Sequence, residues 1–365
     1  MRHFTFVHKA ADILSMLWPR RCLATSAAPK RIGVLLQWGI GDAVLTVPLL
    51  RTLRAVFEDA AVELIGKPFL KDLFADEGLA DQYHRLVPPW TKYSLKYRFW
   101  EADWRIYLTE IRNIRRHSFD ILIAPRWDVR EILQLRLLNA NATAGFAAAG
   151  GRKWITNDFR ITSEQYAKLH RAEAAAVAAQ RLTGQQIDPR PRLNVSTERS
   201  VAVFNHLKSA GYVGGRLMVV HGGAGSPIRR WGGEKFSAVL ARMPLDDSFI
   251  VIIDDEGSED IKLPPNTLGI RWRSSLADLK ALLHHASLFI GCDSGVMHLA
   301  AACGCKVVAV FGPGSIKWFR PYGNEHRIVA IHPMPCRPCF DKCIYQMPIC
   351  MNISADGLIM HINDY

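Results

Sequence analysis

The sequence predicts an α/β protein with two domains, each built around a parallel sheet. Two observations support this prediction. Short apolar runs that end in glycine turns lead into helix-like segments, and this pattern occurs near Ile32 and again near Leu288. A chain of 365 residues is also long enough to bury two separate cores. Two Rossmann-like halves are therefore the expected architecture.

The clearer of the two units begins with an apolar strand at 288–290. A polar turn at 293–295 leads into a helix at 296–303, and a second buried strand follows at 306–311. The turn lies at the carboxyl end of a strand and the amino end of a helix. Open α/β sheets bind ligands at such turns, and a helix amino end attracts phosphate.

The first domain is expected to begin at Arg31, with a strand at 32–36. A glycine turn at 37–42 and a helix at 43–57 follow, with Pro48 near the first helical turn, where proline is tolerated. The same periodicities predict the remaining elements of both domains. These are strands at 61–65, 119–124, 217–220 and 249–253, and helices at 129–138, 163–182, 234–243 and 276–285.

Composition shifts along the chain suggest where the domains meet. A polar stretch rich in Pro, Arg and Ser at 185–200 is the candidate linker. We accordingly divide the chain into four parts. They are a basic amphipathic segment at 1–30, a first domain at 31–195, a second domain at 196–335 and a Cys-rich tail at 336–365.

The formal charge of +12 favours anionic partners, namely nucleic acid, anionic lipid or a phosphorylated substrate. Residues 1–30 are basic, and their apolar side chains recur at helical spacing, which predicts an interfacial helix on a membrane surface. Asp12 interrupts the apolar centre that a cleaved signal peptide needs. The segment also fits a transit peptide or a disordered tail. No stretch of about 20 apolar residues exists, so no spanning helix is expected.

Residues 88–117 form a second basic segment. It contains seven Lys or Arg and three acids, interleaved with three Trp and three Tyr. Such a segment can hold an anionic glycan, a lipid headgroup or nucleic acid. The alternative is an amphipathic helix with its aromatic face in the core.

In the second domain, two successive βα turns can bind a diphosphate together. The loop Gly222, Gly223 and Ala224 follows a strand and lets backbone amides approach an anion, and Arg229 lies a few residues further on. The helix amino end at Asp293, Ser294 and Gly295 supplies the other side, and His298 lies one turn inside on the same face. The loop could equally be an ordinary turn, and His298 could be a core histidine.

An acid after the intervening strand can accept hydrogen bonds from ribose hydroxyls, as in dinucleotide sites. Glu256 is the best candidate, and Asp255 and Glu259 are rivals. In the first domain, Asp42 follows Gly39, Ile40 and Gly41 at a helix amino end. It is either the helix N-cap or a carboxylate that can take a proton from an acceptor hydroxyl.

The chain resembles glycosyltransferase family 9, the bacterial heptosyltransferases of lipopolysaccharide synthesis. Three blocks carry the resemblance: RIGVLLQWGIGDAVLTVPLLRTLR at 31–54, HGGAGSPIRRWGGEKF at 221–236 and FIGCDSGVMHLAAACGCKVVAVFGP at 289–313. The resemblance implies a GT-B fold, in which two Rossmann-like domains face each other across a cleft. It also implies inverting transfer of heptose, typically from an ADP-sugar, without a catalytic metal.

The same resemblance assigns roles to the matching residues. Asp42 matches the general base, and Arg229 matches a position, usually lysine, that contacts the donor's phosphates. The donor-binding positions are Gly222, Gly223, Ala224, Asp293, Ser294, Gly295 and His298. An acidic run at 254–256 replaces glycines found in many members, which leaves the ribose contact at Glu256 open. The acceptor belongs to the first domain, with Gly41, Arg126, Trp127 and Asp128 as candidate contacts.

Cys336, Cys339, Cys343 and Cys350 cluster near the end of the sequence. Without a clear secretory signal, clustered thiols favour a structural zinc or iron site over disulfides. A similar Cys-rich tail occurs in many family members, and a related motif holds iron in the protein heptosyltransferases of autotransporters. Four unpaired thiols in a compact loop are the alternative.

The sequence therefore predicts an inverting glycosyltransferase that moves a sugar, expected to be heptose from ADP-heptose, to a hydroxyl of a lipopolysaccharide-core-type or other glycan. The acceptor is expected to be an anionic glycan or glycolipid. The protein is expected in the cytoplasm, peripheral on the inner face of the inner membrane. Neither a catalytic cofactor nor a nucleic-acid partner is expected.

Two further functions compete with this one. The first is that of a protein O-heptosyltransferase, or of another GT-B enzyme that uses a different nucleotide sugar. The second is that of a nucleic-acid-binding protein with a four-cysteine metal site, which explains the charge and the cysteines. It does not explain the two glycine-rich turns at phosphate-binding positions.

Overall fold

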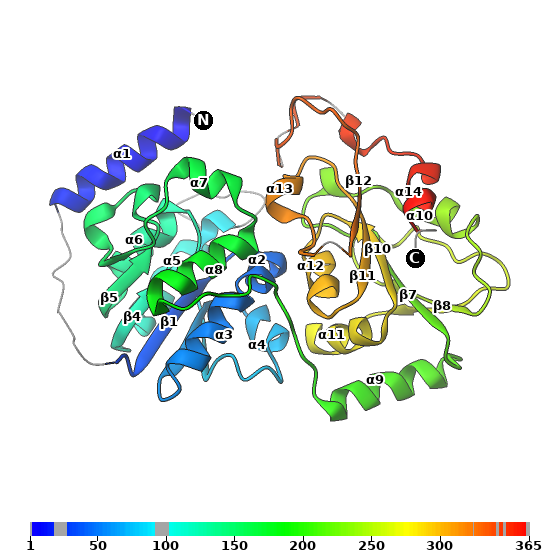
Figure 1. Cartoon of the computed structure of the whole chain (residues 1–365), viewed down its shortest axis with the longest axis horizontal. Coiled ribbons are helices and arrows are strands. Elements are labelled where there is room, and N and C mark those ends of the chain that lie inside the picture. Colours follow the sequence, from blue (N-terminus) through cyan, green and yellow to red (C-terminus); the bar gives the residue numbers. More distant parts are fainter. Residues whose placement is uncertain are drawn as a thin grey trace. The chain divides into compact units, whose positions relative to one another are not determined.

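The structure, a computed structural model of the chain, describes residues 2–17, 28–91, 102–323, 325–340, 343–345 and 348–362. The chain divides into two compact units, Met1–Pro191 and Arg192–Tyr365. Each unit contains a parallel sheet with helices packed against it (Figure 1). No helix in the described part of the chain is both long enough and apolar enough to cross a bilayer.

The sheet of the first unit has six parallel strands in the order β3-β2-β1-β4-β5-β6. Their bounds are β1 Arg31–Leu36, β2 Ala61–Gly66, β3 Gln82–Arg85, β4 Phe119–Ile123, β5 Ala140–Gly145 and β6 Asn157–Asp158. The central strand β1 is almost wholly buried because both of its faces are covered. In register, Ile32 lies opposite Val62 of β2 and Ile121 of β4.

The helices of the first unit are α1 Arg2–Leu17, α2 Ile40–Leu45, α3 Val47–Val56, α4 Phe69–Leu73, α5 Ala102–Ile114, α6 Val129–Leu137, α7 Ser163–Lys168 and α8 Arg171–Thr183. Two predicted helices are each divided in the structure. The helix expected at 43–57 breaks at Thr46, and Pro48 lies in the first turn of the second piece, α3. The helix expected at 163–182 breaks before His170, whose Nδ1 accepts the Ala172 backbone N–H at 3.2 Å and so caps α8.

The second unit repeats the topology of the first. Its sheet order β12-β11-β10-β7-β8-β9 is again all parallel, with two three-strand halves meeting at β7 and β10. The strands are β7 Arg216–His221, β8 Ser248–Ile253, β9 Leu268–Trp272, β10 Leu288–Cys292, β11 Lys306–Val310 and β12 Arg327–Val329. This doubly wound order, present twice, confirms the predicted fold class.

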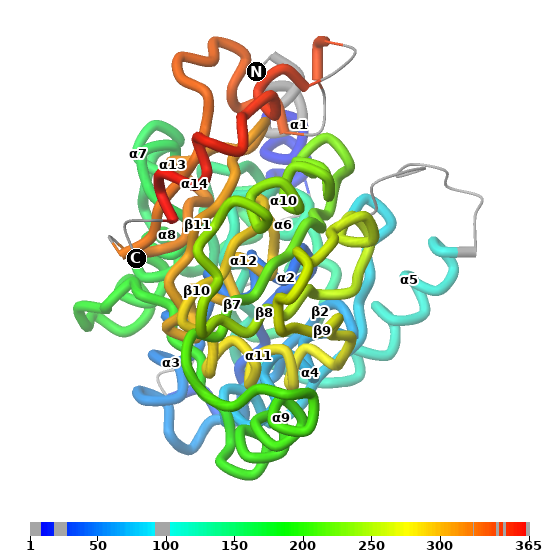
Figure 2. Tube along the Cα trace, turned by 90° about the vertical axis from the view of Figure 1, so that its right-hand side faces the viewer, coloured from blue at the N-terminus to red at the C-terminus, as the bar shows by residue number. Residues whose placement is uncertain are grey.

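The helices of the second unit are α9 Thr197–Ser209, α10 Gly233–Leu240, α11 Leu276–His285, α12 Gly295–Ala302, α13 Ile316–Phe319 and α14 Ala355–Ile362. Helix α9 begins inside the stretch predicted as a linker, capped by Ser196, and packs beside α11 (Figure 2). Gly304 follows α12 with a φ of +84°, a left-handed conformation that suits glycine at the end of a helix.

The first and the last helices of the described residues pack onto their own units. Helix α1 lies against the first unit, where Asp12 Oδ1 accepts the Arg152 backbone N–H at 3.1 Å. Residues 336–365 do not form a separate tail in the described part, because Cys350, Met351 and Leu358 lie in the core of the second unit. The Trp231 indole N–H also donates to the carbonyl oxygen of Ile353 at 3.1 Å.

Candidate active site

The candidate residues gather where the strand order of each sheet reverses. In the first unit this point lies between β1 and β4, and Asp42 and Arg126 follow the carboxyl ends of these strands. In the second unit it lies between β7 and β10, which are followed by Gly222 and Asp293. Open α/β sheets bind ligands at this position. Each unit therefore offers one candidate site.

Asp42 lies in the first turn of α2, with 26% of its side chain exposed. Its Oδ2 accepts the Gly39 backbone N–H at 3.1 Å, and its Oδ1 lies 2.5 Å from Nη1 of Arg126. The N-cap of α2 is Gly39, so Asp42 is not the N-cap residue that the sequence alternative proposed. Asp42 occupies the third helical residue and bonds back to the cap.

The glycine turn that carries Asp42 is held against α6 through Trp38. The Arg126 guanidinium lies over the Trp38 ring, 4.6 Å from its centroid, and that of Arg130 lies 4.9 Å away. The Trp38 indole N–H donates to Oε1 of Glu131 at 2.6 Å. One tryptophan thus positions the arginine that pairs with Asp42.

Glu131 is a buried carboxyl group that the sequence did not single out. Burial, with a smaller contribution from Asp128, raises the pKa of Glu131 to about 8. No spacing in the sequence distinguishes this residue from a solvated helix acid. Its burial follows from the packing of α6 against Trp38, which becomes visible only in three dimensions.

A small pocket lies beside Asp42, with a volume of about 20 Å³, roughly the space that one ordered water needs. It is lined by Asp42, Leu45, Thr46, Pro125, Arg126, Tyr166, Arg171 and Ala175. The Arg171 guanidinium lies 4.1 Å from the centroid of the Tyr166 ring. The pocket therefore combines one carboxylate with two guanidinium groups and an aromatic ring.

A further cation lies within electrostatic range of the same carboxylate. Burial lowers the pKa of Lys67 below its ordinary value, and the negative charge of Asp42 opposes part of this shift. This lysine follows β2, the strand next to β1, so its place at the carboxyl edge of the sheet is set by topology.

The other predicted acceptor contacts have different surroundings. The Trp127 backbone N–H donates to the Tyr166 hydroxyl at 3.2 Å, and the two rings lie 5.0 Å apart. Asp128 caps α6 by accepting the Arg130 backbone N–H at 2.9 Å. Gly41 is buried within α2. Of the predicted acceptor residues, Arg126 is thus the one whose side chain pairs with that of Asp42.

The basic aromatic segment at 88–117 is described only in part, because residues 92–101 lie outside the described residues. Its described aromatic rings pack on one another. Trp90, Trp104 and Tyr107 have ring centroids 5.4–5.9 Å apart, and Trp90 and Tyr107 are buried in the core. For these residues the structure favours the core alternative over a binding surface.

In the second unit, the loop after β7 is tied to the loop after β8. The Gly222 backbone N–H donates to the Ser258 hydroxyl at 3.0 Å, and that hydroxyl donates to Oδ1 of Asp255 at 3.1 Å. The loop amides are assigned to an anion from the sequence, but in the structure the Gly222 amide already has an acceptor, the Ser258 hydroxyl. A Cβ on this residue would lie 2.2 Å from the Gly257 carbonyl oxygen, so close loop packing requires glycine.

His221 links this loop to α12, and the sequence did not single it out either. Its Nε2 lies 2.7 Å from Oδ2 of Asp255, and its Nδ1 lies 3.4 Å from the Ser294 hydroxyl. Ser294 is the N-cap of α12 and accepts the Met297 backbone N–H at 3.3 Å. Asp293 and His298, on either side of Ser294 in sequence, are also buried. The two predicted βα turns thus meet through His221.

The charged residues near these turns form pairs. Nη1 of Arg229 lies 3.9 Å from Oδ2 of Asp293, which brings together two of the predicted donor residues. Glu256, in contrast, is 78% exposed and lies 3.0 Å from Nη2 of Arg230. Its rival Asp255 is held by His221 and Ser258 instead. The acid predicted for ribose therefore lies on the surface, and its rival belongs to the loop network.

The four clustered cysteines are all free thiols, with Cys350 buried and the others half-buried. Burial raises the pKa of Cys339, and Cys336 and Cys343 raise it further. Burial also raises the pKa of Cys350, to which Cys339 and Cys336 contribute. The thiols therefore lie within electrostatic range of one another. Among the described residues, no three of these sulfur atoms lie mutually within 4.8 Å.

Comparison with known proteins identifies the family. The model of glycosyltransferase family 9 (heptosyltransferase) matches residues 108–347. The chain is 23% identical over 304 residues to lipopolysaccharide heptosyltransferase 3 of Escherichia coli, which covers 78% of this chain and 84% of that protein.

Two solved structures share the fold. ADP-heptose lipopolysaccharide heptosyltransferase II of E. coli has a TM-score of 0.66 at 16% identity, covering 92% of this chain and 98% of that one. The iron-containing dodecameric glycosyltransferase TibC of enterotoxigenic E. coli has a TM-score of 0.54 at 15% identity, covering 94% of this chain and 77% of that one. The two six-stranded parallel sheets match those of GT-B heptosyltransferases. The chain belongs to glycosyltransferase family 9, the heptosyltransferases.

Proposed function

We propose that the protein transfers heptose from ADP-heptose, with inversion, to a hydroxyl of a lipopolysaccharide-core-type acceptor. Family membership and the names of its relatives support this donor and acceptor. The observation that carries the proposal is Asp42, an accessible carboxylate paired with Arg126 where the order of the first sheet reverses.

In this proposal Asp42 is the general base. The Gly39 amide and Arg126 fix the orientation of its carboxylate, and its exposed fraction leaves it open to an incoming hydroxyl. It takes the proton of the acceptor hydroxyl as the oxygen attacks the anomeric carbon, opposite the leaving diphosphate. A base of this kind contributes roughly 100- to 10,000-fold to a rate.

The second unit holds the donor in this proposal. Negative charge develops on the nucleoside diphosphate as its bond to the sugar breaks. Arg229 and the amino end of α12 at Ser294 and Gly295 stabilise that charge. Gly222, Gly223, Ala224, Asp293 and His298 shape the surrounding site, with Glu256 toward the ribose. No catalytic cofactor takes part.

The acceptor contacts are assigned to the first unit. Arg126 and Arg171, together with the rings of Tyr166 and Trp127, provide cationic and aromatic groups beside Asp42. Such groups suit an anionic glycan or glycolipid. Gly41 and Asp128 support these contacts through the backbone of α2 and the cap of α6.

We further propose that the protein acts in the cytoplasm, on the inner face of the inner membrane, with α1 as the contact. This helix packs on the first unit through Ala11 and Ser15 while Leu14 and Leu17 remain exposed. Exposed apolar side chains on an amphipathic helix suit the headgroup boundary of a bilayer.

The four C-terminal cysteines are proposed to bind structural zinc or iron. Four thiols are a suitable ligand set for either metal, and one structural neighbour is described as iron-containing. Metal analysis of the purified protein and of Cys339→Ser tests this site. Equal metal content in both proteins would refute it.

The transfer itself is tested with a panel of ADP-, UDP- and GDP-sugars and a heptose-deficient lipopolysaccharide core. The proposal predicts that ADP-heptose raises the melting temperature and is consumed only when the glycan acceptor is present. Preference for another nucleotide sugar would indicate a different GT-B activity, and transfer to a polypeptide instead of the glycan would indicate a protein O-heptosyltransferase.

A further inference from the structure

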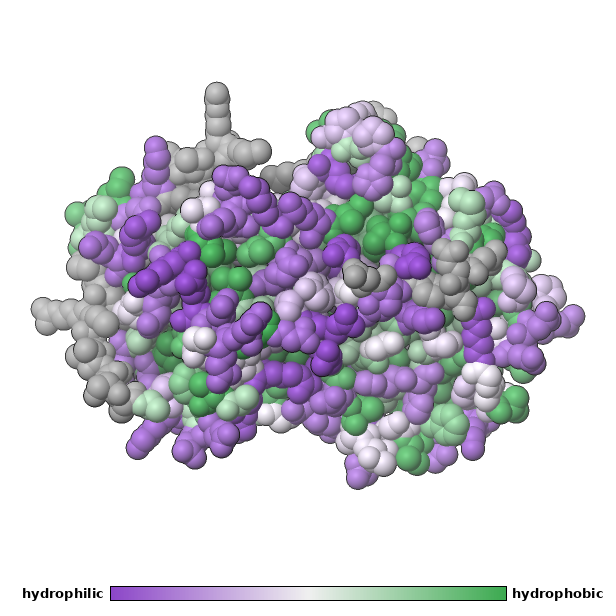
Figure 3. Space-filling model, in the orientation of Figure 1, coloured by the Kyte–Doolittle hydropathy of each residue, from purple (hydrophilic) through white to green (hydrophobic). Residues whose placement is uncertain are grey.

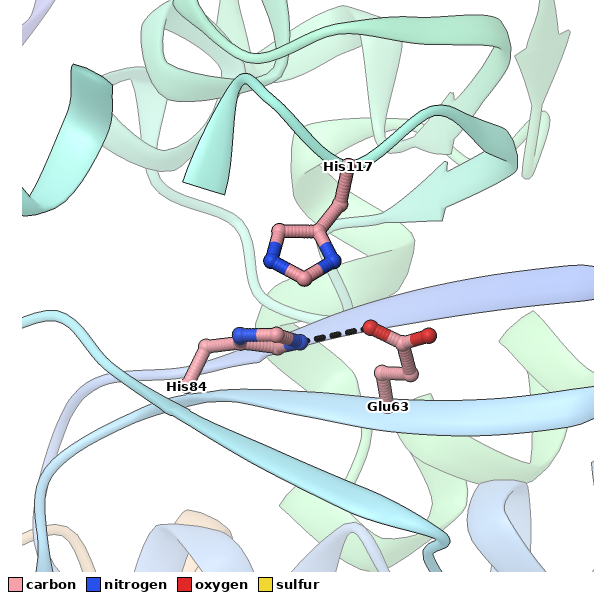
Figure 4. A group of neighbouring side chains, drawn as sticks. All are labelled: Glu63, His84 and His117. Atoms are coloured by element: carbon pink, nitrogen blue, oxygen red, sulfur yellow. Dashed lines mark hydrogen bonds and ion pairs between the residues drawn. The ribbon is translucent and has the colours of Figure 1, made fainter. Parts of the chain in front are cut away.

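Three potential metal ligands converge in the first unit, away from the residues assigned to catalysis. Glu63 lies on β2, His84 lies on β3, and His117 lies in the connection between α5 and β4 (Figure 4). One ligand atom from each side chain lies within 4.8 Å of the other two. Among the described residues this is the one group of His, Cys, Asp or Glu that meets this criterion.

The carboxylate of Glu63 is held on both sides. Its Oε1 lies 2.8 Å from Nε of Arg31, and its Oε2 lies 2.5 Å from Nε2 of His84. The Glu63 side chain is fully buried, and that of His84 is 13% exposed. The Arg31 guanidinium thus lies beside one oxygen as an ion-pair partner, and the other oxygen faces the His84 imidazole.

His117 completes the group from the opposite side. Its ring lies 4.6 Å from the ring of His84, at an interplanar angle of 63°. Figure 4 shows this ring above the His84–Glu63 pair, with a nitrogen on the side of the carboxylate. Its backbone N–H donates to the carbonyl oxygen of Ile114 at 3.0 Å, so the end of α5 holds the backbone that carries the ring. No hydrogen bond to the His117 ring occurs within the described residues.

We propose that Glu63, His84 and His117 bind a divalent transition-metal cation such as Zn²⁺. Two imidazoles and one carboxylate are a recognised ligand set for this ion, and water can occupy the fourth position. Binding requires His84 to present a deprotonated Nε2, so its contact with Glu63 is exchanged for contacts of both groups with the metal.

The position of the group indicates a structural role for the cation. His117 precedes the amino end of β4, whereas Asp42 follows the carboxyl end of β1. Strands β1, β2 and β4 are parallel, so His117 lies toward the amino ends of the strands and Asp42 toward their carboxyl ends. A bound cation would connect the edge strand β3 to β2 and to the α5–β4 connection. This inference does not depend on the proposed transferase activity.

Zn²⁺ titration of the metal-stripped, full-length protein tests the site. Three proteins are compared: wild type, His117→Asn and the matched control His206→Asn, whose histidine is exposed on α9. At a free Zn²⁺ concentration of about 100 times Kd, the melting temperature of wild type and of the control should rise by roughly 5 °C. His117→Asn should need at least about 10-fold more Zn²⁺ for the same rise.

Three further measurements keep the result interpretable. All three proteins should melt within about 2 °C of one another in chelator, which shows that His117→Asn folds. The titration is repeated with Cys339→Ser, and Co²⁺ absorption distinguishes nitrogen and oxygen ligands from thiolates. An unchanged Zn²⁺ response in His117→Asn, or a response lost only in Cys339→Ser, would overturn the proposal. In that case Arg31 and His84 would serve only to neutralise Glu63.

Discussion

Glu131 shows how one buried carboxyl group can make stability depend on pH. In the unfolded chain its pKa is near the ordinary 4.5, whereas burial and Asp128 raise it to about 8 in the folded protein. The folded state therefore retains a proton that the unfolded state loses as the pH rises from 4.5 to 8. The stability that Glu131 contributes is complete below this window and is lost progressively across it.

The variant Glu131→Gln keeps an acceptor for the Trp38 indole and cannot ionise. The free energy of unfolding is measured with denaturant for both proteins. The variant's value minus that of wild type should increase between about pH 5 and pH 8, by on the order of a few kcal/mol. Glu164→Gln, at an exposed position of α7, is the control and should show no such trend. A constant difference between Glu131→Gln and wild type would contradict the raised pKa.

Charged residues in turns could be predicted from the sequence as site residues. The hydrogen-bond partners of buried polar groups could not. Asp42 follows glycines at a helix amino end, which makes it a candidate from the sequence alone, whereas Arg126 is a candidate through the family resemblance. Glu131 and His221 were missed, because their roles depend on which helix or loop packs over them. Hydrogen bonds between residues distant in sequence leave no periodic signal.

At the scale of elements, the loop after β7 depends on close backbone packing. A Cβ at Gly222 would lie 2.2 Å from the Gly257 carbonyl oxygen and 3.1 Å from Cδ1 of Ile261. Gly222→Ala should therefore lower the free energy of unfolding by about 1–3 kcal/mol, and it should weaken ADP binding because the loop must move.

Gly357→Ala is the matched control, measured by the same denaturant and ADP titrations. Position 357 lies in α14, where an added Cβ would meet no atom closer than 3.6 Å. Alanine there should be neutral or stabilising, because it favours the helix. Equal effects of the two substitutions would show that packing at Gly222 has no special role.

Element boundaries show where sequence periodicity stops being informative. The central strands were predicted because they are continuous apolar runs buried on both faces. The strand β5 was missed, because its sequence ANATAG lacks an apolar run. The helices at 43–57 and 163–182 were predicted as continuous, because apolar spacing persists across Thr46 and across His170, where caps divide them.

At the scale of the whole molecule, the chain contains the same doubly wound sheet twice. The fold class followed from the two βα openings, because alternating strands and helices are typical of parallel sheets. On the face shown in Figure 3, hydrophilic residues predominate in both units and interrupt the hydrophobic areas. Large apolar side chains are exposed on α1, where Leu14 and Leu17 are 55% and 78% exposed.

If α1 is the membrane contact, Leu14→Glu combined with Leu17→Glu should reduce binding to vesicles that contain phosphatidylglycerol by at least about 10-fold. Two exposed apolar side chains are lost, and two charges repel the anionic surface. Co-sedimentation measures the binding. The control Val213→Glu changes a side chain that is 92% exposed in the second unit and should leave binding nearly intact. Net charge alone would give Val213→Glu, which adds one charge instead of two, about half the loss of binding free energy seen in the double variant, and that ratio would contradict a contact through α1.

The central claim is that Asp42 accepts the proton while the second unit holds the donor. Asp42→Asn keeps one carbonyl oxygen, which can accept the Gly39 backbone N–H in place of Oδ2, so the turn should stay folded. The amide nitrogen that replaces Oδ1 cannot accept from Arg126. The most direct test measures kcat for heptose transfer and, separately, the Kd for ADP-heptose in wild type and Asp42→Asn. We predict that kcat falls by roughly 100-fold or more while Kd changes by less than about 3-fold. An unchanged kcat, or a loss of donor binding equal to the loss of rate, would contradict this assignment.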